Sequence, residues 1–168
     1  PAVIAGNTGI GLSQRMQSFV LDPKDGPYNV LEPGKRPRAT LTPTIALRDN
    51  LPFLSFAVQG GDTQDQNLLQ FFLNMVEFEM NVQEAAEAAN VNSYQMYSSF
   101  GTHSKEAGRI VVRDDTPPWV IKDLRSKGYN VVTRRLTSGP INAIWFDHKN
   151  GTMWGGSSNF GEDYGIGW

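Results

Sequence analysis

The 168-residue chain contains no cysteine, which excludes disulfide bonds, thiol nucleophiles and thiolate zinc sites. Only two histidines are present, His103 and His148, and no HxH or HxxxH spacing joins them, which argues against a histidine metal site. Acidic and basic residues nearly balance, at 17 and 15, and this argues against a nucleic-acid-binding surface. No apolar run approaches the roughly 20 residues that span a bilayer. What remains is the composition of an ordinary globular domain.

The apolar residues that are present follow helix and strand periods. Residues 67–78, NLLQFFLNMVEF, repeat apolar side chains at steps of three and four and predict an amphipathic helix. Two strands joined at Asp49-Asn50 are predicted to form a hairpin, and residues 141–156 predict another, with Asn150-Gly151 as the strongest two-residue turn signal. We expect one α+β domain over residues 1–168, with an antiparallel sheet covered by helices on at least one face.

Helix-start signals stand at three further places. Thr63 with Gln66, and Asn81 with Glu84, have the spacing of capping boxes, and Pro117-Pro118 opens a helix that ends at Gly128. A long surface loop rich in proline and glycine is expected before the first hairpin. Additional strands are predicted at residues 2–6, 10–12, 93–100, 108–114 and 129–136.

The adjacent glycines Gly60 and Gly61 separate a predicted strand from the predicted helix. No Lys-Ser or Lys-Thr pair follows them, so they are not a P-loop, and GGDTQDQ does not match a dinucleotide-binding fingerprint. They are either an ordinary turn or a pair of exposed backbone N–H groups able to bind an anion or a developing oxyanion. The residues alone favour the turn.

The loop PGKRPRATLTPT allows a similar pair of interpretations. Arg36 and Arg38 are followed by Thr40 and Thr42, a combination of groups that can hold a carboxylate. The simpler alternative is a solvated basic loop whose threonines favour the following strand. On these residues alone the simpler alternative is preferred, and no function beyond that of an α+β domain is defined.

Taken in order, the segments resemble the small subunit of the γ-glutamyltransferase family over essentially the whole chain. The resemblance is carried by PGKRP followed by TLTPTIAL, a strand ending in Gly-Gly, LLQFFLNMVEFEMNVQEA, WVIKDLRSKGYNV, INAIWF and the late GGSS. It implies an N-terminal-nucleophile hydrolase, with a four-layer αββα sandwich of antiparallel sheets. It also implies that the nucleophilic Thr and the strands behind it stand before Pro1, in the N-terminal part of the small subunit, and that a large subunit from the same precursor completes the enzyme.

The resemblance also assigns roles to individual positions. Gly60 and Gly61 match the family's oxyanion hole, and Ala39 and Thr40 match two serines that bind the substrate carboxylate. Two family residues hold the substrate's α-amino group. Arg15 stands at the position of the first, a Gln or Glu, and Ser18 stands at the position of the second, an Asp. No cofactor and no metal is implied. The partner it implies is a small-molecule amide, with no nucleic acid and no membrane span in this chain.

Departures from the family pattern favour its acylase-like branch. Arg15 would face an α-ammonium group, SFAVQGGDTQ replaces GSPGGSR, and Ser158-Asn159-Phe160 replaces a DPR-like element. The expected function is amide hydrolysis or acyl transfer on γ-glutamyl or related acyl amides, through an acyl-enzyme on the Thr outside this chain. The alternative is a catalytically inactive relative that serves as a binding or structural protein.

Overall fold

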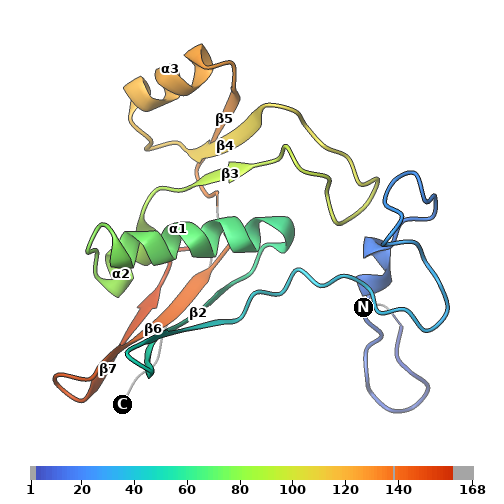
Figure 1. Cartoon of the computed structure of the whole chain (residues 1–168), viewed down its shortest axis with the longest axis horizontal. Helices are drawn as coiled ribbons and strands as arrows, with labels where there is room; N and C mark the ends of the chain where they lie inside the picture. Colours follow the sequence, from blue (N-terminus) through green and yellow to red (C-terminus); the bar gives the residue numbers. More distant parts are fainter. Residues whose placement is uncertain (1–2, 138, 161–168) are drawn as a thin grey trace. The chain divides into compact units, whose positions relative to one another are not determined.

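The main sheet has four antiparallel strands in the order β1-β2-β6-β7 (Figure 1). The structure, a computed structural model, describes residues 3–137 and 139–160. It divides into two units, Pro1–Thr40 with Tyr97–Lys105 and Leu41–Met96 with Glu106–Trp168, and each is described by itself. The sheet lies in the second unit and is built from β1 (Thr44–Arg48), β2 (Leu51–Val58), β6 (Ile141–Asp147) and β7 (Thr152–Ser157).

Both predicted hairpins form, but with different turns. Asp49 and Asn50 have φ values of 53° and 63° between the paired residues Arg48 and Leu51, which is the primed two-residue turn that matches strand twist. In the second hairpin Asp147 pairs with Thr152, so four residues form the loop and the predicted two-residue turn at Asn150-Gly151 is wrong. The Asp147 carboxylate accepts hydrogen bonds from the N–H of Lys149 (3.1 Å) and of Asn150 (3.2 Å) and from Asn150 Nδ2 (2.7 Å), which stabilises the wider loop.

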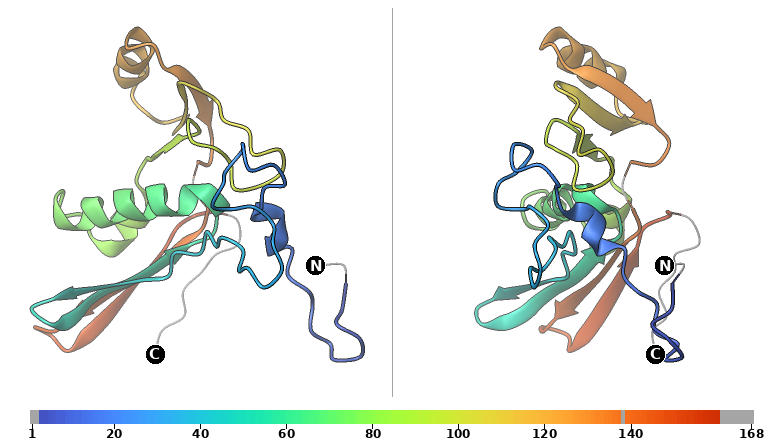
Figure 2. Two further views of the ribbon diagram at one scale, coloured as in Figure 1. Left: turned by 45° about the vertical axis from the view of Figure 1, so that its right-hand side comes forward. Right: turned by 90° about the vertical axis from the view of Figure 1, so that its right-hand side faces the viewer.

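Two helices cover one face of this sheet, α1 (Gln64–Val76) and α2 (Val82–Glu87) (Figure 2). The apolar stripe predicted in residues 67–78 lies on the sheet, and Phe71 of α1 packs against Phe56 of β2 with ring centroids 5.3 Å apart. Burial of these side chains is the main source of the unit's stability. The core consists of Leu54, Phe56, Val58, Leu68, Phe71, Val82, Ala85, Ala86, Ile141 and Ala143.

One of the two predicted capping boxes is present. Asn81 accepts hydrogen bonds from the N–H groups of Gln83 and Glu84, and the Glu84 side chain accepts from the N–H of Asn81. The box predicted at Thr63 and Gln66 is wrong, because a 3-10 turn, η2 (Gly61–Thr63), runs directly into α1 and gives Thr63 a helical backbone. The Thr63 hydroxyl instead donates to the Gly60 carbonyl at 3.0 Å.

A second sheet has the strand order β3-β4-β5, from β3 (Val91–Ser93), β4 (Arg109–Arg113) and β5 (Asn130–Arg134). The β3–β4 pair is antiparallel, whereas β4 and β5 are parallel and are connected through helix α3 (Pro118–Ser126), with Pro118 in its first turn as predicted. The strand predicted at residues 93–100 is wrong, since the strand ends at Ser93 and residues 94–100 have no regular secondary structure.

Three glutamine side chains hydrogen bond to the outer edges of strands. Gln66 of α1 pairs with both backbone groups of Ser93 at 2.7 and 3.2 Å, and Gln70 pairs in the same way with Val91 at 2.8 Å for both bonds. On α2, Gln83 pairs with Ser157 of β7 at 2.8 and 3.1 Å. Strands β3 and β7 are both terminal in their sheets, so these amides occupy edge groups that would otherwise be open.

The first unit consists mainly of loops around a 3-10 turn, η1 (Arg15–Ser18). The strands predicted at residues 2–6 and 10–12 are reduced to one isolated bridge between Ile4 and Gly11, and residues 1–2 lie outside the described residues. His103 holds two loops together, since its Nδ1 lies 2.9 Å from the Ser98 carbonyl oxygen and its Nε2 lies 3.1 Å from that of Phe19.

Candidate functional site

The two adjacent glycines lie where β2 ends and the α1 segment begins. Gly60 has a φ of +153° and Gly61 a φ of +59°, both in the region that side chains other than glycine rarely adopt. Gly60 is exposed and Gly61 is half-buried. The glycines are therefore required by the backbone path, because a side chain at either position would be strained.

These two amides are available as donors. Within residues 3–137 and 139–160, no hydrogen bond runs from the N–H of Gly60 or Gly61 to an acceptor. The 13-residue helix α1 begins at Gln64, after η2, and its positive end favours negative charge near this position. Two free N–H groups beside a helix N-terminus can stabilise an oxyanion, as the resemblance implies for these positions.

The other predicted site residues gather in the first unit. Arg15 donates from a guanidinium nitrogen to Thr40 Oγ1 at 3.1 Å, and its guanidinium carbon lies 5.6 Å from the centroid of the Phe100 ring. Among the residues that the structure describes, Arg15 forms no ion pair with a carboxylate. Arg15 is thus a half-buried cation fixed beside a hydroxyl, an arrangement suited to an anionic group.

Ser18 and Ala39 make different contributions to this cluster. The Ser18 hydroxyl is buried and donates to the carbonyl oxygens of Arg15 at 2.9 Å and Arg38 at 3.1 Å, so it ties η1 to the loop that carries Thr40. Ala39 is exposed and has no polar side-chain atom. The structure therefore brings Arg15, Ser18 and Thr40 together, while Gly60 and Gly61 belong to the other unit and are described within it.

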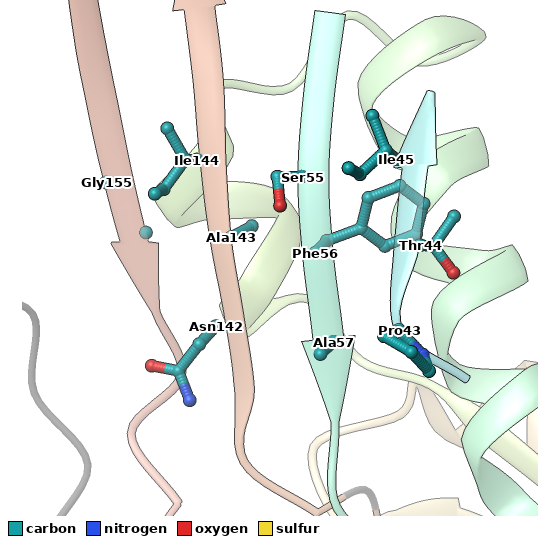
Figure 3. Close-up of a pocket in the computed structure, with 11 residues that line it drawn as sticks. Pro43, Thr44, Ile45, Ser55, Phe56, Ala57, Asn142, Ala143, Ile144 and Gly155 are labelled. Carbon is teal, nitrogen blue, oxygen red and sulfur yellow. The ribbon is translucent and has the colours of Figure 1, made fainter. Parts of the chain in front are cut away.

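A groove of ≈ 660 Å³ lies on the face of the main sheet that α1 and α2 leave uncovered (Figure 3). Ile45 is 69% exposed there and Ile144 is 42% exposed, and none of the described residues that line the groove is titratable. Its principal lining residues are Ile45, Ser55, Ala57, Asn142, Ile144 and Gly155. This face is therefore suited to packing against another apolar surface, and its lining residues include no acid, base or charged group that could take part in a reaction.

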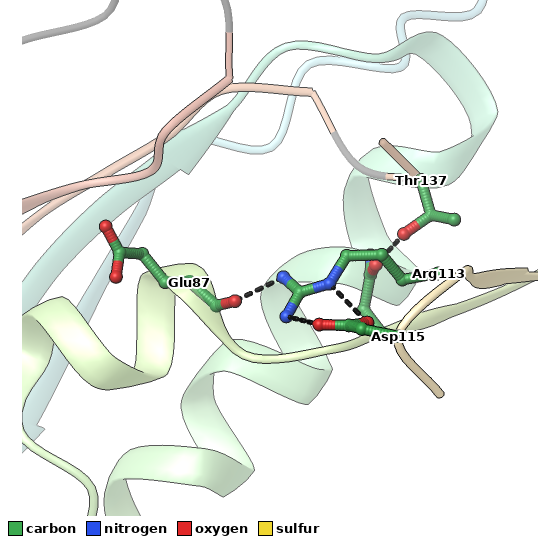
Figure 4. Close-up of polar contacts among 5 residues, drawn as sticks. Glu87, Arg113, Asp115 and Thr137 are labelled. Carbon is green, nitrogen blue, oxygen red and sulfur yellow. Dashed lines mark hydrogen bonds and ion pairs between the residues drawn. The ribbon is translucent and has the colours of Figure 1, made fainter. Parts of the chain in front are cut away.

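The titratable groups with perturbed pKa values hold structure together. Arg113 donates to both carboxylate oxygens of Asp115, at 2.7 and 2.5 Å, and to the carbonyl of Glu87 (Figure 4). The hydrogen bond from Arg113 lowers the pKa of Asp115, and the same bond raises the pKa of Arg113. No side-chain hydrogen bond caps the N-terminus of α3, the helix that follows Asp115. Within the described residues, no group of His, Asp or Glu could hold a metal ion.

The fold can be compared with solved structures. Gamma-glutamyltranspeptidase from Pseudomonas nitroreducens, complexed with L-DON, matches with a TM-score of 0.80 at 22% identity, covering 99% of this chain and 86% of that chain. At this identity the likeness concerns the fold. It confirms the expected class, an α+β protein with the fold of the N-terminal-nucleophile hydrolases. No helix in the described part of the chain is long and apolar enough to cross a membrane.

Sequence comparisons define the family within that class. The family profile described as Gamma-glutamyltranspeptidase matches residues 2–168. Glutathione hydrolase proenzyme of Bacillus subtilis (strain 168) is 30% identical over 166 residues, which cover 98% of this chain and 26% of that protein. Acylase ACY 1 proenzyme of Pseudomonas sp. (strain SE83) is 26% identical over 147 residues, covering 88% of this chain and 24% of that protein. The chain belongs to the gamma-glutamyltranspeptidase family, and it spans about a quarter of the length of these relatives.

Two features of the site escaped sequence reasoning. The sequence predicts Thr63 as a helix cap, but its hydroxyl donates to the carbonyl of Gly60. The sequence indicates no role for Gly139, whose backbone lies directly against the Gln59 carbonyl. A threonine three residues after Gly60 is a local signal that fits both a helix cap and a hydrogen bond to the Gly60 carbonyl. In contrast, no local pattern indicates that Gly139 contacts Gln59, which lies 80 positions earlier in the chain.

Proposed function

We propose that the chain is part of an N-terminal-nucleophile amidohydrolase or acyltransferase, and that Gly60 and Gly61 supply its oxyanion hole. In the reaction, a nucleophilic Thr hydroxyl outside these residues attacks the substrate's amide carbonyl and forms a tetrahedral oxyanion. The amine then leaves with a proton, and water or a second amine releases the acyl group. The observation that carries the proposal is a pair of N–H groups just before α1 that have no acceptor among the described residues, in a chain that belongs to this family.

The magnitude expected of this site is substantial. One oxyanion-hole donor is typically worth about 10²–10³ in kcat. Both donors come from backbone N–H groups, so a side-chain substitution cannot remove them without changing the local backbone. Their partial positive charge is reinforced by α1, whose dipole acts over the first turn of the helix.

The cluster around Arg15 supports a preference for acyl groups that carry an anion and lack an α-ammonium group. The Arg15 guanidinium would repel an ammonium group and would pair with a carboxylate, while Thr40 adds a hydroxyl to the same cluster. Ser18 and Ala39 complete this part of the proposed substrate pocket. Ser18 fixes the loop that carries Thr40, and Ala39 is the exposed residue next to Thr40. This favours an acylase-like specificity over that of a γ-glutamyltransferase.

We further propose that the remaining parts of the protein, a large subunit and the N-terminal part of the small subunit, cover the apolar face of the main sheet. The exposed side chains Ile45 and Leu47 on β1 and Ile144 on β6 are 69%, 64% and 42% exposed on this face. Water-exposed apolar side chains at this density are typical of surfaces that are covered in the complete protein. The length of the relatives supports the same arrangement.

The test uses the complete protein that contains this chain and two anilides of equal chain length. γ-Glutamyl anilide carries an α-ammonium group, and glutaryl anilide differs from it only by lacking that group. We expect glutaryl anilide to be hydrolysed with the higher kcat/KM. The variant Arg15→Gln restores an amide and should shift the ratio of the two kcat/KM values toward γ-glutamyl anilide by about tenfold, the value of one hydrogen bond to a charged group.

Two outcomes separate the alternatives. Dominant turnover of γ-glutamyl anilide by the wild-type protein would contradict the acylase-like specificity but leave the hydrolase assignment intact. An acyl-lactam amide serves as a further substrate of the acylase class. Absence of turnover with all three compounds would favour the inactive relative that acts as a binding or structural protein.

A further inference from the structure

We propose that Thr63 and Gly139 are positioning residues that orient the two backbone donors, Thr63 for Gly61 and Gly139 for Gly60. This inference rests on the proposed oxyanion hole and names the residues that fix its geometry. Neither residue would touch the substrate through its side chain. Each acts on a carbonyl group that shares a peptide plane with one of the donors.

A peptide unit is rigid and planar, so the direction of a carbonyl determines the direction of the N–H that follows it. The Gln59 carbonyl and the Gly60 N–H share one plane, and the Gly60 carbonyl and the Gly61 N–H share the next. Glycine permits a wide range of φ and ψ, so two adjacent glycines do not hold these planes by themselves. An outside contact on each carbonyl is therefore needed to aim both donors.

Thr63 provides the contact on the Gly60 carbonyl. Its hydroxyl donates to this oxygen at 3.0 Å and its N–H donates to the same oxygen at 3.3 Å. The hydroxyl makes no helix-capping hydrogen bond, and it donates to the Gly60 carbonyl instead. A Cβ on Gly60 would lie 2.8 Å from Thr63 Oγ1, which shows how closely the two residues approach.

Gly139 provides the contact on the Gln59 carbonyl. A Cβ on Gly139 would lie 1.7 Å from the Gln59 oxygen and 2.6 Å from its carbonyl carbon, so only glycine fits at this position. The atoms on the other side are backbone atoms, which cannot move aside as a flexible side chain can. An ordinary carbon–oxygen contact is roughly 3.3 Å or more, so any larger residue must push the Gln59–Gly60 peptide away by over about 1 Å.

A hydrogen-bonded network anchors the segment that leads to Gly139. The Thr137 hydroxyl, labelled in Figure 4, donates to the Asn90 side chain. The Thr137 carbonyl accepts from the Asn92 side chain. Asn90 in turn donates to Oδ1 of the buried Asn67 on α1 at 2.5 Å. These bonds join Thr137 to α1 and β3, although Asn67 Nδ2 and Asn92 Oδ1 have no partner among the described residues. The Gly139 contact is thus tied to α1, the helix that follows the two donors.

The test compares Thr63→Val with Thr63→Ser in the complete mature enzyme, using the better of the two anilides. Valine keeps the shape of threonine but has no hydroxyl, whereas serine keeps the hydroxyl. We expect Thr63→Val to lower kcat about tenfold or more with KM within about threefold, because the donors act on the transition state rather than on the bound substrate. Thr63→Ser should retain most of the wild-type kcat.

Gly139→Ala tests the second contact, and Gly26→Ala is its matched control. A misplacement of about 1 Å costs roughly 100-fold in rate, so we expect Gly139→Ala to lower kcat about 100-fold with little change in KM. A Cβ on Gly26 would lie 3.8 Å from the nearest atom, an ordinary contact, and Gly26→Ala should keep wild-type kinetics. Thermal unfolding of each variant verifies that mature, folded enzyme is compared.

The outcomes distinguish this inference from the function on which it rests. No turnover by the wild-type enzyme would refute the proposed function itself. Wild-type turnover with an unchanged kcat in Thr63→Val, or with Thr63→Ser as impaired as Thr63→Val, would refute the positioning role and leave the function standing. A rise in KM at constant kcat would refute it equally. If Gly139→Ala yields no folded enzyme, the comparison of Thr63→Val with Thr63→Ser tests the positioning role without it.

Discussion

The glutamine side chains on α1 provide the most specific test of how this fold is held together. Gln66 and Gln70 are four residues apart on the helix, a rise of about 6.0 Å, and the strand residues that they bond, Ser93 and Val91, are separated by about 6.8 Å. The two spacings match closely enough for both amides to pair at once with alternate backbone groups of β3. Methionine has nearly the same length and helix propensity as glutamine but cannot form these bonds, so Gln70→Met isolates the hydrogen bonds.

The expected loss follows from the two bonds between Gln70 and Val91. Each is 2.8 Å long, and a typical intramolecular hydrogen bond contributes about 0.5–1.5 kcal/mol net. Val91 is 39% exposed, so water replaces part of what is lost. We expect Gln70→Met to reduce the local stability of this edge by about 1–2 kcal/mol, which corresponds to roughly 5–30-fold faster amide hydrogen exchange at Val91.

Hydrogen exchange of the complete protein measures this effect and contains its own control. The N–H of Ser157 is held by Gln83 on α2, and its exchange should not change in Gln70→Met. In Gln83→Met the pattern should reverse, with Ser157 exchanging faster and Val91 unchanged. Equal protection of Val91 in the wild type and in Gln70→Met would refute the reasoning. So would a uniform increase at both amides, because that would indicate a global loss of stability rather than the loss of one edge contact.

Three further predictions concern stability. The hydrogen bonds that Asn150 and the backbone donate to the Asp147 carboxylate lower its pKa. The stability that this carboxylate contributes is complete above the unfolded-state pKa and is lost as pH falls through the lower folded-state pKa, so the Tm difference between wild type and Asp147→Asn should shrink as pH falls below about 5. Asn50→Val places a β-branched residue at a φ of 63° and should cost about 1–2 kcal/mol by denaturant unfolding, whereas Asn50→Gly should be neutral or stabilising. Phe71→Ala removes a side chain that is 1% exposed and should cost about 3–5 kcal/mol, and a loss below about 1 kcal/mol would contradict the described core.

Several elements could be predicted because their signals lie within a few residues. The helix over residues 67–78 follows from the spacing of its apolar side chains, and the Asn81–Glu84 capping box involves residues three apart. The first hairpin follows from Asp49-Asn50, two residues that tolerate positive φ. The resemblance to the family also came from the sequence, since the order of its motifs survives over the whole chain.

Tertiary structure decided the features that depend on residues far apart in the chain. Gln66 was predicted to cap α1, but the edge of β3 offers it two backbone partners, and η2 leaves no cap geometry for Thr63. The β4–β5 pairing is parallel because α3 carries the chain back across the sheet, which strand patterns alone do not reveal. The exclusion of a side chain at Gly139 likewise arises from a distant carbonyl, that of Gln59. Local sequence specifies the turns, caps and periods of this protein, whereas the direction of its two glycine amides depends on contacts that exist only once the sheet and helix have packed.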